Sequence, residues 1–578
     1  MKNIGYIFML LAVFAVSCSD DLLNKFPEDE ISPEQYWKTP NDLALFLNQF
    51  YTSFPVHSNW DGGIFEFDNN SDNLASFDIN TRFVGSDNTP PTSDGTWDSK
   101  YSSIRSINYY LENSTMAEGP QDVLNAYQGE AYFFRAMFYF DLLRRYGGVP
   151  YIDKVLNTNS PELMSPRMPR NELATKIIED LDKAIANLKP RAATEAFRVH
   201  RGMALALKSN VGLYEGTWEK YHQGTDFAAP INESEKFLQA AVDAAGTLID
   251  EGNYTLYNNG AADTYWDLFT KIDYSGVSEV MFWKKYDIDE GVGHRVGHYI
   301  PQNGAGTGVT KSLVDSYLCM DGLPISVSGL YSSSQESSLS DIIINRDPRL
   351  KQTICTPGDL ITTRSGNPDI FFEFPAFREN TETVSTTGYQ IYKGGNTDED
   401  QRTDSYIGAI IYRYGEVLLN FAEAKAELGS LTQGDLDKSI NLLRGRVGMP
   451  ALSINPVADP NKAFPELSDL INEVRRERRV EMALEGKRFD DLMRWKADHL
   501  IVGKRHQGFK IIGSDMETEF QDLIGSSILV NAEGYIDPYI NAIPAGFGFK
   551  VGRDYLSPIP SEQIVLTGGI VKQNPGWE

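Results

Sequence analysis

Two stretches rich in glycine, asparagine and aspartate, residues 55–96 and 283–299, place aromatic rings beside amide, carboxylate, imidazole and guanidinium groups. Such a mixture suits a ligand that has an apolar face and a hydroxyl rim, as a sugar ring does. An exposed aromatic ring can stack on the C–H face of the sugar, and the apolar area buried contributes about 25 cal/mol per Å² to the binding free energy. Planar polar side chains can form hydrogen bonds with the hydroxyl groups at the rim of the sugar. The alternative to ligand contact, for each side chain in either stretch, is a structural role. An aromatic ring would then be buried in the loop, and a polar group would be hydrogen-bonded within the protein.

Metal and catalytic chemistry are poorly supported by the same residues. His294 and His298 have the i, i+4 spacing of a zinc motif, but Arg295 stands where the catalytic Glu belongs and Gly297 disfavours a helix. The segment "DNNSDN", residues 68–73, begins like a calcium loop, yet Asn73 replaces its glycine and Ile79 its bidentate glutamate. The chain has 80 acidic residues, so pairs of carboxylates occur throughout it and do not indicate a catalytic site. We predict no catalytic residue, no metal and no cofactor, with a noncanonical calcium site elsewhere in the chain as the open alternative.

The amino terminus has the pattern of an exported and lipidated protein. One lysine precedes an apolar run that ends at Ser17, which is signal-peptide length and too short for a permanent span. Ala15-Val16-Ser17-Cys18 resembles the bacterial lipobox, and Ser19-Asp20-Asp21 resembles an acidic surface-export signal. We predict a signal peptide over residues 1–17, a lipidated Cys18 with a flexible tether over 18–30, and a Gram-negative outer-membrane protein that faces the cell exterior. The alternative is a plain secretory peptide with a chance cysteine.

Composition excludes several classes of protein. The chain has 578 residues and a formal net charge of −27, a surface that repels phosphate backbones, so nucleic acid is not expected as a partner. If Cys18 is lipidated, Cys319 and Cys355 leave at most one disulfide. Residues beyond 17 contain no apolar run long enough to span a membrane.

Helical periodicity dominates two parts of the chain. Thr39 and Pro40 look like the N-cap and first position of a helix, and apolar residues recur every three or four positions through 122–152. Further helices are predicted at about 170–188, 201–215, 233–251, 412–429, 435–448 and 467–496. The last of these interleaves arginines with glutamates at spacings of three and four, which predicts ion pairs along one helix; an anion-binding patch is the alternative.

Seven segments in order resemble the SusD/RagB family of surface glycan-binding lipoproteins. They are "FPEDEISPEQYWKTPNDL", "GEAYFFRAMFYFDLLRRYGGVPYI", "LYEGTW", "SEVMFW", "YRYGEVLLNFAEAKAELG", "RRERRVEMALEGKRFDDLMRW" and "YLSPIPSEQI…QNPGW". The resemblance covers nearly the whole chain. It implies a mainly α fold, in which tetratricopeptide-like helix pairs form a right-handed superhelical frame, and an irregular loop-rich region carries a few short strands.

We therefore expect a single body over residues 31–578. Its helical frame covers about 31–54, 97–251 and 412–496, its irregular ligand-binding region about 55–96 and 255–400, and a turn-rich segment 497–578. In the family, ligand contacts tend to come from loops in these two irregular regions. Chemistry then selects the predicted glycan contacts: Trp60, Phe65, Asp68, Asn73, Arg82, Trp283, Tyr286, His294 and Tyr299.

The resemblance also implies a role and partners. Family members bind oligosaccharide without cutting it and present it to a SusC-like TonB-dependent outer-membrane transporter for nutrient uptake. Two alternatives stay open at this point. In the first alternative, the chain is a surface-anchored glycoside hydrolase. In the second, it binds peptide, as some members of the family do.

Overall fold

The computed structural model describes residues 36–58, 61–378 and 383–578. The predicted signal peptide, Cys18 with its tether, and Trp60 lie outside these ranges. Within them, no helix is both long and apolar enough to cross a membrane.

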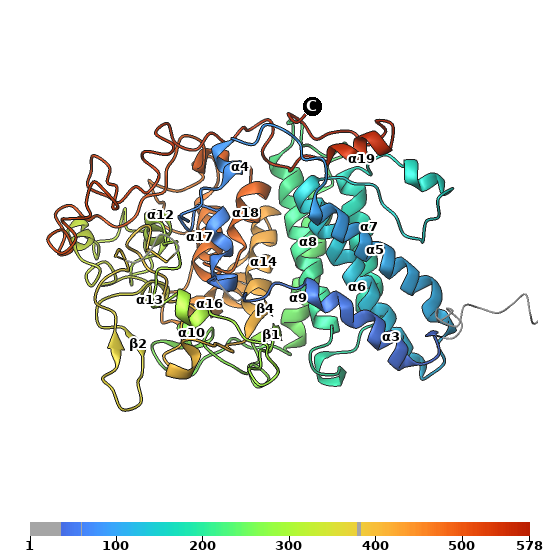
Figure 1. Ribbon diagram of the computed structural model, residues 1–578, viewed down its shortest axis with the longest axis horizontal. Helices are drawn as coiled ribbons and strands as arrows, with labels where there is room; N and C mark the ends of the chain where they lie inside the picture. The colour runs from blue at the N-terminus through green and yellow to red at the C-terminus, as the bar shows by residue number, and fades with distance from the viewer. Residues whose placement is uncertain (1–35, 59–60, 379–382) are drawn as a thin grey trace, which may run out of the picture.

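Long helices that follow one another in sequence also pack side by side, and they form one half of the molecule (Figure 1). In order they are α5 (Gly95–Asn113), α6 (Gln121–Tyr146), α7 (Arg170–Asn187), α8 (Arg201–Tyr221) and α9 (Ser234–Glu251). α14 (Tyr414–Glu427) packs against α9, and α17 (Asp469–Glu481) packs against α14. Each helix thus buries its apolar side against its neighbours, the logic of stacked helical repeats.

Close contact between α8 and α9 depends on two glycines of α8. A Cβ at Gly212 would lie 2.6 Å from the carbonyl oxygen of Phe237, and one at Gly216 would lie 2.9 Å from the backbone nitrogen of Leu238. Both partners are main-chain atoms of α9 that have no freedom to move aside. These glycines therefore set the distance between the two helices.

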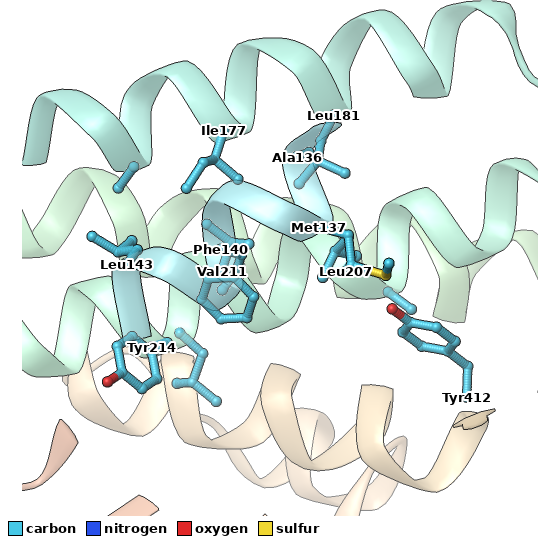
Figure 2. Packing of buried hydrophobic residues seen from close by; sticks show 14 of the residues in the cluster. Ala136, Met137, Phe140, Leu143, Ile177, Leu181, Leu207, Val211, Tyr214 and Tyr412 are labelled. Carbon is cyan, nitrogen blue, oxygen red and sulfur yellow. The ribbon is translucent and has the colours of Figure 1, made fainter. Parts of the chain in front are cut away.

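α6 lies in the middle of the helical core. Figure 2 shows its side chains, among them Met137 and Phe140, enclosed by Ile177 of α7 and by Val211 and Tyr214 of α8. Because neighbours cover α6 on several sides, its buried residues extend around the helix and are not confined to one stripe.

The other half contains mostly loops, short helices and two small antiparallel sheets. β1 (Val280–Lys284) pairs with β4 (Ala409–Arg413), and β2 (Leu360–Thr362) pairs with β3 (Ile370–Phe371). The short helices of this half are α10 (Thr264–Asp267), α11 (Val296–Tyr299), α12 (Lys311–Ser316) and α13 (Pro348–Lys351). A second hydrophobic core, distinct from that of the long helices, lies beneath these loops. The mainly α fold with few short strands is confirmed.

Most predicted helices are found, with changes at their ends. α3 (Pro40–Leu47) has Thr39 as N-cap in a capping box, as its sequence indicates. The helices predicted at 170–188 and 233–251 match α7 and α9, and α8 continues to Tyr221. Two other predicted helices are divided. The segment 435–448 forms α15 (Gln433–Asp437) and α16 (Ile440–Arg446), and 467–496 forms α17 and α18 (Arg488–Arg494). The remaining short helices are α4 (Thr81–Val84) and α19 (Ser561–Leu566).

The charges of α17 pair mainly across the fold, and the prediction of pairs along one helix is confirmed for a single pair. Only the Arg476–Glu473 pair, 3.1 Å apart, lies within the helix. Glu481 is fully buried and accepts hydrogen bonds from Arg446 at 2.7 Å and Arg413 at 2.8 Å. Arg349 of α13 completes the cluster at 2.9 Å. The helix is therefore a buried ionic junction between the helical half and the loop-rich half.

Burial alone would raise the pKa of Glu481, but the guanidinium groups of Arg446, Arg413 and Arg349 lower it well below its ordinary value. The carboxylate therefore stays charged in the folded protein at every pH near neutrality. Removing its charge would leave buried guanidinium groups short of a counter-ion, which is far costlier than losing an exposed pair.

Glu481→Gln is expected to lower the free energy of unfolding by about 3–5 kcal/mol, because it leaves buried arginines uncompensated. The urea midpoint followed by circular dichroism measures this loss. Arg378→Gln, which breaks the exposed Arg378–Asp522 pair, is the control and should leave the midpoint unchanged. Equal effects of the two substitutions would contradict the role given to the junction.

The same substitution should flatten the acid dependence of stability. A carboxylate whose pKa is depressed by folding stabilises the protein above its unfolded pKa, about 4.3 for Glu, and loses that contribution as pH falls. Between pH 6 and pH 3 the urea midpoint of Glu481→Gln should therefore fall less than that of the wild type. A parallel fall in both proteins would show that Glu481 is not held charged.

Candidate functional site

The aromatic residues predicted in the second stretch are mostly buried. Trp283 lies in β1 and is 6% exposed, with its ring against Gly408 and edge-on to Tyr274. Tyr286 is 3% exposed, and its hydroxyl bonds both the backbone nitrogen and the carbonyl oxygen of His57. Both rings are packed in the interior, so neither presents a face to a sugar. We assign both side chains to the core.

His294 is also a structural residue. It is 1% exposed, its Nε2 lies 2.9 Å from the carbonyl oxygen of Ile407, and its ring lies 4.6 Å from that of His57. Burial lowers the pKa of His294 to about 4, so the imidazole is neutral at pH 7. Tyr299, at the end of α11, is half-buried and remains a candidate contact.

In the first stretch, the predicted polar contacts bond the protein itself. Asp68 is fully buried and accepts hydrogen bonds from the Asn73 side chain at 2.9 Å and from the backbone nitrogen of Leu484 at 2.8 Å. Asn73 in turn accepts a bond from Arg479 at 2.8 Å. Arg82 is half-buried, bonds the carbonyl oxygen of Asp554 and covers a phenylalanine ring. Asp68 and Asn73 therefore hold the loop in place.

A neighbouring aspartate fixes the same loop still more firmly. Asp72 receives two hydrogen bonds from Arg488, at 2.7 and 3.0 Å, and an ion pair from Arg479 at 3.2 Å. Burial raises the pKa of Asp72, but the two guanidinium groups outweigh it and hold the pKa well below its ordinary value. The loop is thus locked to α17 and to the start of α18 by buried charge.

The exposed rings of this loop are residues that the prediction did not select. Phe67 and Phe77 are 43% and 56% exposed, whereas Phe65 is 4% exposed and stacks on His57. A 3-10 helix, Gly63–Asn70, places residues three apart on one side, so Phe65 and Asp68 turn inward together. Phe65 therefore belongs to the core.

Polar groups accompany the two exposed rings. Asn70 and Asp78 are exposed, and the half-buried Asn69 accepts a hydrogen bond from Thr307 at 2.6 Å. We call residues 63–80 the platform segment. It combines two exposed rings with amide and carboxylate groups on a backbone that the buried ion pairs of Asp72 attach to α17 and α18. This arrangement can stack an apolar face and bond a hydroxyl rim.

The described residues contain no group of three or more His, Cys, Asp or Glu side chains placed to hold a metal ion. Cys319 and Cys355 are both buried and unpaired in the structure.

Comparison with known proteins places the chain in a family. The model of the SusD family matches residues 271–577, and a model described as "Starch-binding associating with outer membrane" matches residues 27–213. SusD-like protein P2 of Formosa agariphila is 24% identical over the full length of both chains. SusD-like protein P38 of the same organism is 25% identical over 87% of this chain and 93% of its own.

Solved structures share the fold. A SusD-like protein from Bacteroides fragilis matches with a TM-score of 0.71 and 24% identity, over 96% of this chain and 100% of its own. A protein described as a laminarin-binding SusD-like protein matches with a TM-score of 0.57 and 19% identity, over 93% of this chain and 100% of its own. Because a family model spans more than half of the sequence, this chain belongs to the SusD family.

Proposed function

We propose that this protein is a cell-surface lipoprotein that captures oligosaccharides and passes them to a SusC-like TonB-dependent outer-membrane transporter. Membership of the SusD family supports the carbohydrate ligand, as do the starch-binding description of the amino-terminal match and the laminarin-binding neighbour. The words "associating with outer membrane" in the same description support the location. The protein binds its ligand and does not cleave it.

The observation that carries this proposal is the pair of exposed rings on a rigid segment. Phe67 and Phe77 present apolar area to solvent, and covering such area gains about 25 cal/mol per Å². The exposed Asn70 and Asp78 supply bonds to hydroxyl groups. Since buried ion pairs of Asp72 already fix the backbone, ligand binding need not order the loop, which preserves affinity.

Three predicted contacts remain in the proposed site beside the platform segment. Tyr299 and Arg82 are half-buried, so part of each side chain is accessible to a ligand. Trp60 belongs to the same stretch, outside the described residues, and has the residue type that stacks most area on a sugar.

The proposed anchor is a diacylglycerol on Cys18, with the mature chain beginning there. Several acyl chains, each gaining about 0.8 kcal/mol per buried methylene, hold a protein firmly on a membrane. Tethering beside a transporter raises the effective concentration of captured ligand, so modest affinity suffices for delivery.

Replacing both platform rings should weaken glycan binding. The double substitution Phe67→Ala and Phe77→Ala is expected to reduce affinity about tenfold or more, because it removes both stacking faces. Affinity gels that contain laminarin or starch measure retention. Phe371→Ala, which removes a ring of similar exposure on β3, is the matched control and should migrate as the wild type does. Equal migration of the double variant and the wild type would remove the platform from the site.

Cys18→Ala should release the protein from membranes, because it removes the thiol that carries the lipid. Fractionation of cells followed by immunoblotting measures the distribution. Ser19→Ala, a change next to the proposed acylation site, should leave the protein in the membrane fraction. Retention of the Cys18→Ala protein in that fraction would contradict the lipid anchor.

Incubating the purified protein with laminarin or starch should release no soluble oligosaccharide, as measured by chromatography of the products. A glycoside hydrolase of known activity on each polymer is the positive control. Product formation that follows the protein through purification would favour the hydrolase alternative.

A further inference from the structure

A cavity of about 350 Å³ lies at the beginning of α7 and is lined by none of the platform residues. Its walls come from the 147–169 connection, the end of the 222–230 loop and the carboxyl-terminal segment. Residues that define it include Gly148, Arg167, Arg170, Phe227, Leu556 and Lys572. The volume falls at the lower end of the ~300–1,000 Å³ range of small-molecule sites.

Arg167 lines this cavity without a carboxylate partner among the described residues. Four of its N–H groups are donated to neutral oxygens: the carbonyl oxygens of Gly148, Lys572 and Tyr146, and the side-chain oxygen of Asn574. Burial, and after it the neighbouring Arg170 guanidinium, lower the pKa of Arg167 to about 10. The side chain is therefore still cationic at neutral pH, and its charge is uncompensated.

Arg170, which also lines the cavity and stacks its guanidinium on the Trp218 ring, has one donor that no described protein group bonds. It is 5% exposed, and it binds Glu215 through Nε at 2.8 Å and Nη2 at 2.7 Å. Nη1 lies on the other edge of the guanidinium plane, away from Glu215. It is buried and has no hydrogen-bond partner among the described residues. A buried charged donor without a partner is costly in a folded protein.

Backbone charge at this position has the same sign. Arg170 is the first residue of α7, an 18-residue helix, and the N-cap position is Pro169, which supplies no capping side chain. The positive end of the helix dipole and its free N–H groups favour an anion there. Of the cavity's lining residues, only Asp226 is acidic; it is exposed, and the exposed Lys572 offsets its charge.

We propose that this cavity binds a small organic anion, about the size of one acidic sugar residue, with its carboxylate or sulfate group on Arg170 Nη1 and Arg167. The anionic oxygens would accept the unused N–H of Arg170 and neutralise Arg167. The body of the ligand would lie against the apolar wall formed by Phe227, Leu556 and nearby prolines. The choice of a sugar as carrier of the charge rests on the proposed glycan role, whereas the anion requirement follows from the arginines.

Isothermal titration calorimetry of the full chain at low ionic strength tests this site. The probes are glucuronate, glucose 6-sulfate, glucose and inorganic sulfate. We expect glucuronate or glucose 6-sulfate to bind at least tenfold more tightly than glucose, and either one more tightly than inorganic sulfate. Arg167→Gln should weaken that binding at least tenfold. Arg105→Gln is the matched control, since Arg105 lines a different cavity and bonds only a main-chain oxygen, and it should bind as the wild type does.

A second variant is needed because Arg167 also forms four structural hydrogen bonds, and the Arg167→Gln protein could lose binding by misfolding. Ala228→Glu adds a carboxylate to the half-buried cavity wall and should abolish anion binding while thermal unfolding stays close to the wild type. The Phe67→Ala and Phe77→Ala double variant should keep full anion affinity, which separates this site from the platform.

Three results would overturn the proposal. Glucuronate and glucose 6-sulfate binding no more tightly than glucose would show that charge is not recognised. Wild-type affinity in both Arg167→Gln and Ala228→Glu would place any anion elsewhere. Inorganic sulfate binding as tightly as glucose 6-sulfate would reject an organic ligand. None of these outcomes bears on laminarin or starch retention by the platform, so the two proposals fail separately.

Discussion

The buried charge around α17 is the constraint on which the arrangement of this molecule depends. Glu481 gathers three arginines that come from β4, α16 and α13, and Asp72 of the loop gathers Arg479 and Arg488. Ions in a protein interior persist only when their partners are well placed. These pairs join β4, α13, α16 and the loop to α17 through named partners, in addition to the hydrophobic contacts between the two halves.

The platform segment inherits its rigidity from this junction. Asp68, Asp72 and Asn73 point inward to arginines and a backbone nitrogen of the α17–α18 region, while Phe67 and Phe77, on either side of them, are exposed. A surface that is fixed before the ligand arrives loses less entropy on binding. The helical half makes no proposed contact with the sugar. Its role is to position α17, whose buried ion pairs attach the loop.

The sequence predicted what depends on local pattern and missed what depends on distant contacts. The capping pair Thr39-Pro40 and the spacing of apolar residues were enough to locate α3, α7 and α9, since helix signals lie within a few residues. Local pattern could not tell whether Phe65 or Phe67 is exposed, because the two residues lie in one polar stretch. What turns Phe65 inward is the attachment of Asp68 to Leu484, 416 positions away. The charges of α17 misled for the same reason, as Arg349 pairs with Glu481 across 132 positions.

A crystal structure of the protein with a laminarin or starch oligosaccharide tests the central claim most directly. The account predicts that a sugar face lies on Phe67 or Phe77, that hydroxyl groups bond polar side chains of residues 63–80, and that the Asp72–Arg488 pair is unchanged from the free protein. An oligosaccharide bound to a surface that contains neither ring, with the platform segment left in solvent, would contradict it.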